Sequence, residues 1–267
     1  MTLITSRVRA TACLLPLLLI ASAGCDIAMA EYNEQATTEW RKNYELQAGG
    51  RVEISNVNGK IDVMPAKGNT VEIIAKTIGK ASSAEAARQA MERIHIVDTS
   101  SGGLIKVDTK VDRGGGGGLF SHSQASVEYT VRVPANAELK VTTVNGGVQI
   151  EGLTGRINAE TTNGGIRGRD IGGEIEATTT NGGVELELAA VTGDVKLECT
   201  NGGIELRLPS EAKATIAARI SNGGIKTEGL ALAPRESSQR RLDADLNGGG
   251  PRISLDGTNG GISISAR

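Results

Sequence analysis

Short segments in which apolar and polar residues alternate flank a tripeptide, Asn-Gly-Gly, that recurs through the second half of the chain. Aliphatic residues usually stand six and four positions before its asparagine and three and five positions after it, as in half-buried strands. Each repeat therefore predicts two short strands joined by a turn. A variant, Asn-Gly-Lys, begins at Asn58 in the same frame. The tripeptide itself begins at Asn145, Asn163, Asn181, Asn201, Asn222 and Asn259.

Two architectures fit this repeat. Asn-Gly is a strong hairpin signal and favours an antiparallel meander, whereas a two-strand coil of about 18–21 residues favours a parallel β-solenoid, or β-helix. In a solenoid, residues at one offset lie above one another about 4.8 Å apart, so charges there are expected to alternate in sign. They alternate six positions after five of the asparagines, at Glu151, Arg169, Glu187, Arg207 and Glu228. We therefore predict an all-β parallel solenoid over residues 136–267, with the meander as the alternative.

The solenoid makes two surface predictions. The six asparagines should form a turn ladder, and the residues that precede them, mostly threonine, could form a second hydrogen-bonded column. The five alternating charges should face solvent as an interaction ladder.

Residues 46–135 depart from the repeat after a first coil around Asn58. The pattern predicts strands over 71–75, 104–111 and 126–133, and a short helix over 82–94 that Ser82 or Ser83 can cap. We expect this helix to cover an open end of the solenoid, because exposed strand edges promote aggregation. The glycine run 114–118 predicts a loop. Residues 229–252, whose apolar positions are out of frame around Asn247, predict an insertion or loop.

The N-terminus has the pattern of a secretory signal. Arg7 and Arg9 precede an apolar run over 12–23 that is too short for a comfortable membrane span. Cleavage before Cys25 would remove residues 1–24 and leave a lipidated cysteine, and cleavage after Ala30 would remove residues 1–30. Residues 31–45 would then be a linker. We expect an exported protein of the periplasm or cell surface, held at the membrane if Cys25 carries a lipid.

Composition narrows the range of partners. The formal net charge is −2 and no basic cluster stands out, so we expect no nucleic acid partner. No phosphate-binding loop is present, so we expect no nucleotide and no cofactor. No aromatic residue follows Tyr129, which leaves an aliphatic core for the repeats. Cys199 is the one cysteine beyond residue 25, and we expect it to be a small core residue.

The sequence offers little for catalysis or metal binding. The two histidines, His95 and His122, precede the repeats, and we expect both to be structural or solvated. Asp243, Asp245 and Asp256 flank the irregular region and could hold Ca²⁺, although a solvated loop is the simpler interpretation. We therefore predict no catalytic, cofactor-binding or metal-binding residues.

The run T-N-G-G-[VI]-x-[VIL], the T-G-x-[IV] half-turns and the V-x-V-P motif at Val131 to Pro134 resemble a bacterial adhesin family of unknown function, the β-strand-repeat relatives of the head-GIN adhesin domain. The resemblance covers about residues 46–267. It implies a β-solenoid-like fold and an envelope location, and it supplies no catalytic residues. Some relatives are tied to envelope-stress signalling.

Three functions stay open at this point. The chain could be a non-catalytic structural or interaction module that binds an unknown envelope protein or polysaccharide. It could instead be an envelope-stress sensor or a binding module for a polar glycan or an anionic ligand. A polysaccharide-acting enzyme is the more remote alternative.

Overall fold

The computed structural model describes residues 34–112 and 123–267. Residues 1–33 with Cys25, the glycine run 114–118 and His122 lie outside the described residues, so the expectations for them stay predictions. The described part contains nineteen strands and one helix, which lies between the fourth and fifth strands.

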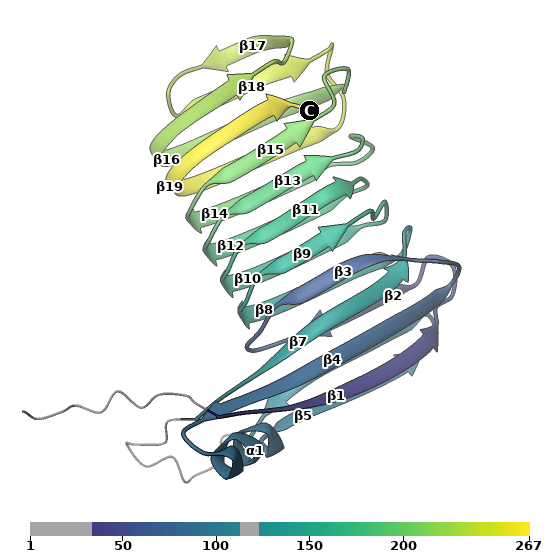
Figure 1. The fold of residues 1–267 in the computed structure, drawn as a ribbon. Coiled ribbons are helices and arrows are strands. Elements are labelled where there is room, and N and C mark those ends of the chain that lie inside the picture. The colour runs from purple at the N-terminus through teal and green to yellow at the C-terminus, as the bar shows by residue number, and fades with distance from the viewer. Residues whose placement is uncertain (1–33, 113–122) are drawn as a thin grey trace, which may run out of the picture. The chain divides into compact units, whose positions relative to one another are not determined.

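The strands form two rows that enclose one aliphatic core (Figure 1). Neighbouring strands within each row are hydrogen-bonded. One row contains, in spatial order, β5 (Ile94–Ser101), β6 (Leu104–Val111), β2 (Arg51–Ser55), β8 (Glu138–Asn145), β10 (Ile157–Asn163), β12 (Ile175–Asn181) and β14 (Val195–Asn201). The other contains β1 (Glu34–Glu45), β4 (Thr70–Ala81), β7 (Ser123–Pro134), β3 (Ile61–Ala66), β9 (Val148–Glu151), β11 (Ile166–Ile171), β13 (Val184–Leu188) and β15 (Ile204–Leu208).

Strands in successive coils of the repeat pair in parallel, which confirms the solenoid and excludes the meander. Ala159 of β10 lies between Val141 of β8 and Ala177 of β12, and Asn163 lies between Asn145 and Asn181 in the same register. Equivalent positions therefore stack over one another. The aliphatic positions on either side of the turn point inward and are buried, as the period-2 pattern predicts.

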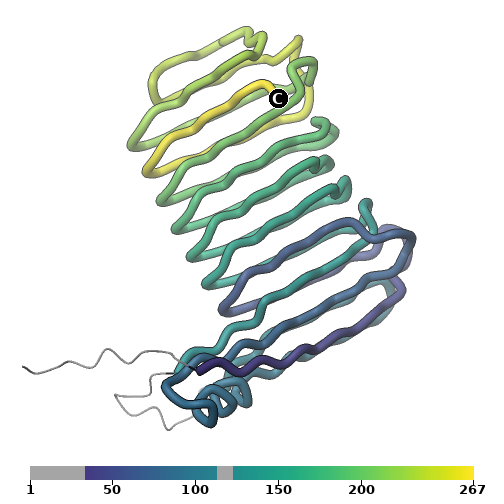
Figure 2. The backbone as a smooth tube through the Cα atoms, in the orientation of Figure 1, coloured from purple at the N-terminus to yellow at the C-terminus, as the bar shows by residue number. Residues whose placement is uncertain are grey.

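The spatial order of the coils differs from their order in sequence at the C-terminal end. Two long strands, β16 (Ala214–Glu228) and β19 (Arg252–Ala266), each run through both rows and through an Asn-Gly-Gly turn. β19 pairs with β14 and β15 on one side and with β16 on the other. The last strand of the chain therefore lies between two coils that are consecutive in sequence, as the yellow segment in Figure 2 shows.

The irregular region 229–252 is an ordered hairpin, so the alternative of a loop was wrong. β17 (Leu232–Ser237) pairs antiparallel with β18 (Arg241–Leu246), and β18 pairs antiparallel with β16. Leu242, Ala244 and Leu246 of β18 are buried, although they are out of frame with Asn247. This hairpin extends the first row beyond β16. The position next to β15 is occupied by β19.

The prediction of a linker over residues 31–45 was also wrong for the residues that the structure describes. Residues 34–45 form β1, which pairs with β4 over twelve residues, and β4 in turn pairs antiparallel with β7. Trp40 and Tyr44 of β1 pack against the core from this end. The tyrosine hydroxyl donates to Asp98 of β5 at 3.1 Å, and Lys42 lies 2.5 Å from the same carboxylate. These contacts join the end strands of the two rows.

The predicted helix is present as α1 (Ala84–Glu92). Ser83 is its N-cap, and its side chain accepts a hydrogen bond from the Ala86 N–H. The helix packs against β4, where Gly79 leaves room for the Ala87 carbonyl, and it also contacts β1 and β7. Its buried residues, Ala87 and Ala90, lie outside the main core cluster, and the helix leaves one edge of β1 and one edge of β5 unpaired among the described strands. No described helix is long and apolar enough to cross a membrane.

Candidate functional site: a groove along the Asn-Gly-Gly turns

Seven asparagine side chains form one continuous hydrogen-bonded ladder along the stacked turns. Six of the seven Nδ2 groups donate to the Oδ1 of the asparagine in the adjacent coil, at 2.7–2.9 Å. The ladder runs, in spatial order, through Asn222, Asn259, Asn201, Asn181, Asn163, Asn145 and Asn58. This asparagine ladder fixes the position of every turn relative to the next one.

The first glycine of each turn is required by the stacking. Gly182 has φ +149°, and a Cβ atom there would lie 2.0 Å from the carbonyl oxygen of Gly164 in the adjacent coil. The equivalent contact at Gly202 would be 1.9 Å. No side chain fits at such distances, so this glycine allows two turns to approach one another closely.

The second glycine is not required by the turn. A Cβ atom on Gly203 would lie 3.5 Å from its nearest neighbour, the carbonyl oxygen of Gly261, and one on Gly261 would lie 3.8 Å from the carbonyl oxygen of Gly224. Neither glycine has a left-handed φ. The first coil gives direct proof, because Lys60 occupies the equivalent position after Asn58 and Gly59. The contact is tighter at Gly165 and Gly183, where a Cβ atom would lie 3.3 Å from the carbonyl oxygen of the next coil. Stereochemistry therefore does not explain the glycine at positions 203 and 261.

In three coils, the buried residue two positions before the asparagine hydrogen-bonds a carbonyl of the adjacent turn from the core side. Thr161 donates from Oγ1 to the Gly146 carbonyl at 2.9 Å, and Thr179 donates to the Gly164 carbonyl at 2.8 Å. Cys199 occupies the same position, with its Sγ 3.0 Å from the Gly182 carbonyl, and burial raises the pKa of this thiol. Cys199 is thus buried as predicted. The hydrogen-bonded column was predicted one position before each asparagine instead. The residues at that position, such as Thr162 and Thr180, are exposed.

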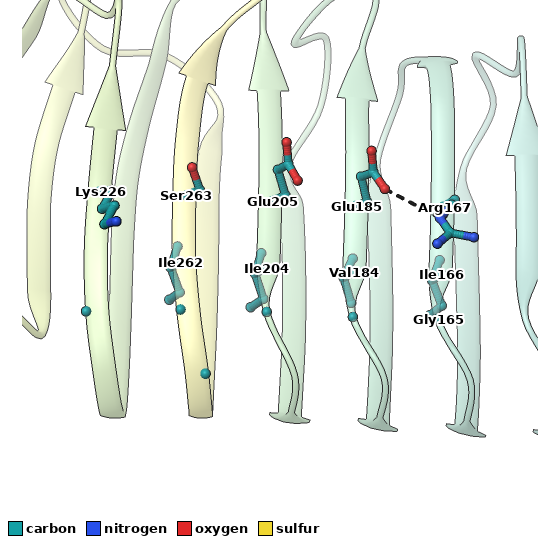
Figure 3. A pocket seen from close by; sticks show the side chains of 15 residues that line it. Gly165, Ile166, Arg167, Val184, Glu185, Ile204, Glu205, Lys226, Ile262 and Ser263 are labelled. Carbon is teal, nitrogen blue, oxygen red and sulfur yellow. Dashed lines mark ion pairs between the residues drawn. The ribbon is translucent and has the colours of Figure 1, made fainter.

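The row of second glycines forms the floor of a groove of about 580 Å³ that crosses five coils. Figure 3 shows the side chains that border it, which come from β11, β13, β15, β19 and β16 in that spatial order. The glycines of the floor are Gly165, Gly183, Gly203, Gly261 and Gly224. We call this feature the glycine groove.

Polar side chains stand along one side of the glycine groove, four positions after each asparagine. The two ends are positive and the middle is negative, and Arg167 lies 3.4 Å from Glu185. In spatial order, this column contains Arg167, Glu185, Glu205, Ser263 and Lys226. Glu205 also pairs with Arg207, which lies beyond the groove on the same strand. The column has two positive and two negative charges and so offers a hydrogen-bonding surface without a net charge.

The predicted interaction ladder of alternating charges is not continuous. Glu151 and Arg169 are in register, and so are Glu187 and Arg207. Between these two pairs the register shifts at a bulge in β11, where Asp170 has φ +52°. At the other end, Ser265 of β19 lies between Arg207 and Glu228. Glu187 of this predicted ladder forms an ion pair with Arg267, at 2.9 Å, which is not part of the ladder.

The other candidate residues are separated in the structure. Asp243 and Asp245 both bind Arg235 at 2.9 Å, while Asp256 lies on β19, so the three carboxylates do not surround a common point. His95 is exposed on β5, with its Nε2 2.9 Å from Asp112. Sequence reasoning missed the glycine groove because it assigned both glycines to the turn. Lys60 was the signal in the sequence that the second position accepts a side chain.

The fold and the groove define a two-row parallel β-solenoid with a surface channel along its turns. The chain belongs to the Toastrack DUF4097 family, whose model matches residues 50–265. It is similar in structure to a candidate cell adhesion protein from Clostridium sporogenes, with 13% identity, a TM-score of 0.46, and coverage of 87% of this chain and 100% of the other.

Two further solved structures from Bacteroidetes are similar at lower scores. A candidate adhesin from Bacteroides fragilis has 11% identity and a TM-score of 0.31, and the alignment covers 86% of this chain and 97% of that one. A candidate lipid-binding protein from Parabacteroides distasonis has 13% identity and a TM-score of 0.30, with 86% and 96% covered. No curated protein matches the chain.

Proposed function

We propose that this chain is a non-catalytic interaction module of the bacterial cell envelope, and that its glycine groove binds one extended, uncharged glycan chain. The observation that carries the proposal is the second glycine, which every coil along the groove keeps although a Cβ atom has room at Gly203 and Gly261 and Lys60 occupies the equivalent position in the first coil. A side chain at this position would fill the groove. The open floor is therefore the main consequence of the glycine.

The geometry of the groove favours a polymer over a compact ligand. The groove repeats the same backbone unit from coil to coil, at the strand separation of about 4.8 Å. Consecutive sugar units of an extended β-1,4-linked glycan advance by nearly the same length and are flipped from one to the next, so every second unit can meet the same backbone groups two coils further along. The groove residues include no aromatic side chain, so contacts would be hydrogen bonds to the glycine backbone and to the polar column.

The charges of the groove favour a neutral ligand. Glu185 and Glu205 stand near its middle, where an anionic chain would meet two carboxylates, and Arg167 is already paired with Glu185. Hydroxyl groups both donate and accept hydrogen bonds, so they suit a border that contains acidic, basic and hydroxyl side chains. An uncharged glycan is therefore the ligand class that the groove fits best.

The envelope location in this proposal is supported by the N-terminal sequence. Arg7 and Arg9, the apolar run and the two cleavage patterns are those of an exported protein. A lipid on Cys25 would hold the module at a membrane. Mass spectrometry of the mature N-terminus tests this part, because it distinguishes a lipidated Cys25 from a free Glu31.

Filling the groove tests the binding function. The double variant Gly203→Gln and Gly261→Gln places two neutral side chains on the floor at positions where a Cβ atom has room. We expect calorimetry to show binding of chitohexaose, an uncharged β-1,4-linked glycan, to the native chain and at least tenfold weaker binding to the variant. Polygalacturonate, an anionic chain, should bind neither protein.

Gly147→Gln is the matched control. It changes the second glycine of a turn in the same way, and a Cβ atom there would lie 3.5 Å from the Gly165 carbonyl, but Gly147 does not border the groove. This variant should bind chitohexaose as the native chain does. Equal binding by the native chain and the filled variant, or a loss of binding in the control as well, would contradict the proposal.

A further inference from the structure

One long strand edge at the N-terminal end of the stack has no partner among the described residues. β1 pairs with β4 over its whole length of twelve residues, and no described strand pairs with its other edge. β1 contains no proline. The opposite end is different, because the unpaired edge of β17 carries Pro234, which cannot donate to an added strand. Unpaired edges of this length form a template for another strand.

The sequence of β1 is complementary to itself when two copies run antiparallel about Trp40. Residues directly opposite each other then point to the same face, so Trp40 meets the partner's Trp40. Glu39 meets the partner's Arg41, and this pair occurs twice because of the two-fold symmetry. Both charged side chains are more than half exposed in the single chain, where Arg41 lies 3.3 Å from Glu39 of its own strand. Opposite charges directly across two strands stabilise their pairing.

We propose that two copies of this chain associate through their β1 edges, with the two-fold axis at Trp40. The first row supports the same contact, because β5 is its unpaired end strand and Val97 on β5 is one of the few large apolar side chains left exposed among the described residues. The association extends both rows from one copy into the other. It does not depend on the glycine groove, which lies at other coils.

Lys42 does not prevent this pairing. A charged side chain on the core-facing side of an edge strand usually discourages an added strand, and Lys42 shares the face of Trp40 and Tyr44. Here, however, the ammonium group lies 2.5 Å from Asp98, and the Tyr44 hydroxyl donates to the same carboxylate. The charge is therefore balanced within each copy, and no unpaired ion would be covered.

Charge reversal with rescue tests the association. Sedimentation velocity across a dilution series should show a dimer of the native chain that dissociates on dilution. Glu39→Arg, or Arg41→Glu, puts like charges opposite each other twice, so each should raise the dimer dissociation constant about tenfold. The double variant Glu39→Arg with Arg41→Glu restores opposite charges and should restore the dimer. Trp40 is the only tryptophan, so its shielding from a soluble quencher should increase with association.

Glu160→Arg, a reversal on an exposed residue of the inner strand β10, is the control and should leave the dimer unchanged. A thermal unfolding curve for each variant shows that the fold is intact. A native chain that stays monomeric at every concentration would overturn the proposal. A double variant that remains as dissociated as the single ones would overturn it as well, because complementarity across β1 would then play no part.

Discussion

Asn259 donates a side-chain hydrogen bond to Asn201 at 2.9 Å, although 58 residues separate the two in sequence. Asn222 follows Asn201 in the chain but lies one coil further away and donates to Asn259 instead. The order of the hydrogen bonds in the asparagine ladder therefore follows from the position of β19 between β15 and β16. The β17–β18 hairpin pairs with β16, and β16 in turn is joined to β14 and β15 by β19.

Because Asn259 lies inside the ladder and Asn222 lies at its end, replacing Asn259 should destabilise the fold more than replacing Asn222. Asn259→Ala removes two side-chain hydrogen bonds, whereas Asn222→Ala removes one at the end of the ladder. At about 1 kcal/mol for each bond lost, Asn259→Ala should lower the free energy of unfolding by about twice as much. Urea unfolding of both variants measures this difference. Equal losses would show that the spatial order of the coils does not govern their stability.

The first glycine of one turn and the second glycine of the next should respond oppositely to the same substitution. Gly182→Ala forces a side chain against the Gly164 carbonyl at a left-handed φ, so we expect a loss of more than about 2 kcal/mol or no folded protein. Gly203→Ala has room and an ordinary φ, so it should be neutral or stabilise by up to about 1 kcal/mol. Chemical denaturation compares them, and a large loss at Gly203 would mean that the turn itself needs its second glycine.

The buried threonine column offers a matched pair of substitutions. Thr179→Val removes the hydroxyl that donates to the Gly164 carbonyl, and it should cost about 1–3 kcal/mol because that carbonyl loses a buried partner. Thr143 is equally buried, but its Oγ1 has no hydrogen-bond partner, so Thr143→Val should be neutral or stabilising. Thermal unfolding distinguishes the two variants. A similar cost at both positions would assign the effect to packing rather than to the hydrogen bond.

The contact between the two end strands predicts a dependence of stability on pH. Hydrogen bonds from Lys42 and then Tyr44 hold the pKa of Asp98 below its usual range. Because the pKa of Asp98 is lower in the folded than in the unfolded chain, ionised Asp98 stabilises the fold at a pH above the ordinary carboxyl pKa. This stabilisation is lost as the pH falls through the pKa of Asp98 in the folded chain. The stability difference between the native chain and Asp98→Asn should therefore shrink in acid. Denaturation at a series of pH values checks this, and a constant difference would contradict it.

The repeated part of the fold could be predicted because one period set both the strands and their stacking. Asparagines spaced by one coil indicated where each turn lies, and parallel pairing then followed from equal offsets. The place of β19 could not be predicted, because the coils around Asn222 and Asn259 carry the same pattern and either could follow β14 and β15. Only the β17–β18 hairpin, whose apolar positions are out of frame, separates the two.

The groove and the N-terminal strand escaped prediction for different reasons. The two glycines of a turn look alike in sequence, and only the position of the neighbouring carbonyl shows that Gly182 is required and Gly203 is not. β1 carries charged and polar residues on an unpaired edge, so its apolar signal is reduced to Ala36, Trp40 and Tyr44. A predominantly polar strand of this kind resembles a linker until its partner is known.

Hydrogen exchange with and without chitohexaose tests the proposed function most directly. Binding in the glycine groove should slow the exchange of backbone amides at residues 165–167, 183–185, 203–205 and 261–263, which border it, and leave residues 147–149 unchanged. Unchanged exchange in all of these segments, or protection confined to other surfaces such as the coil faces around Arg169 and Arg207, would contradict the account.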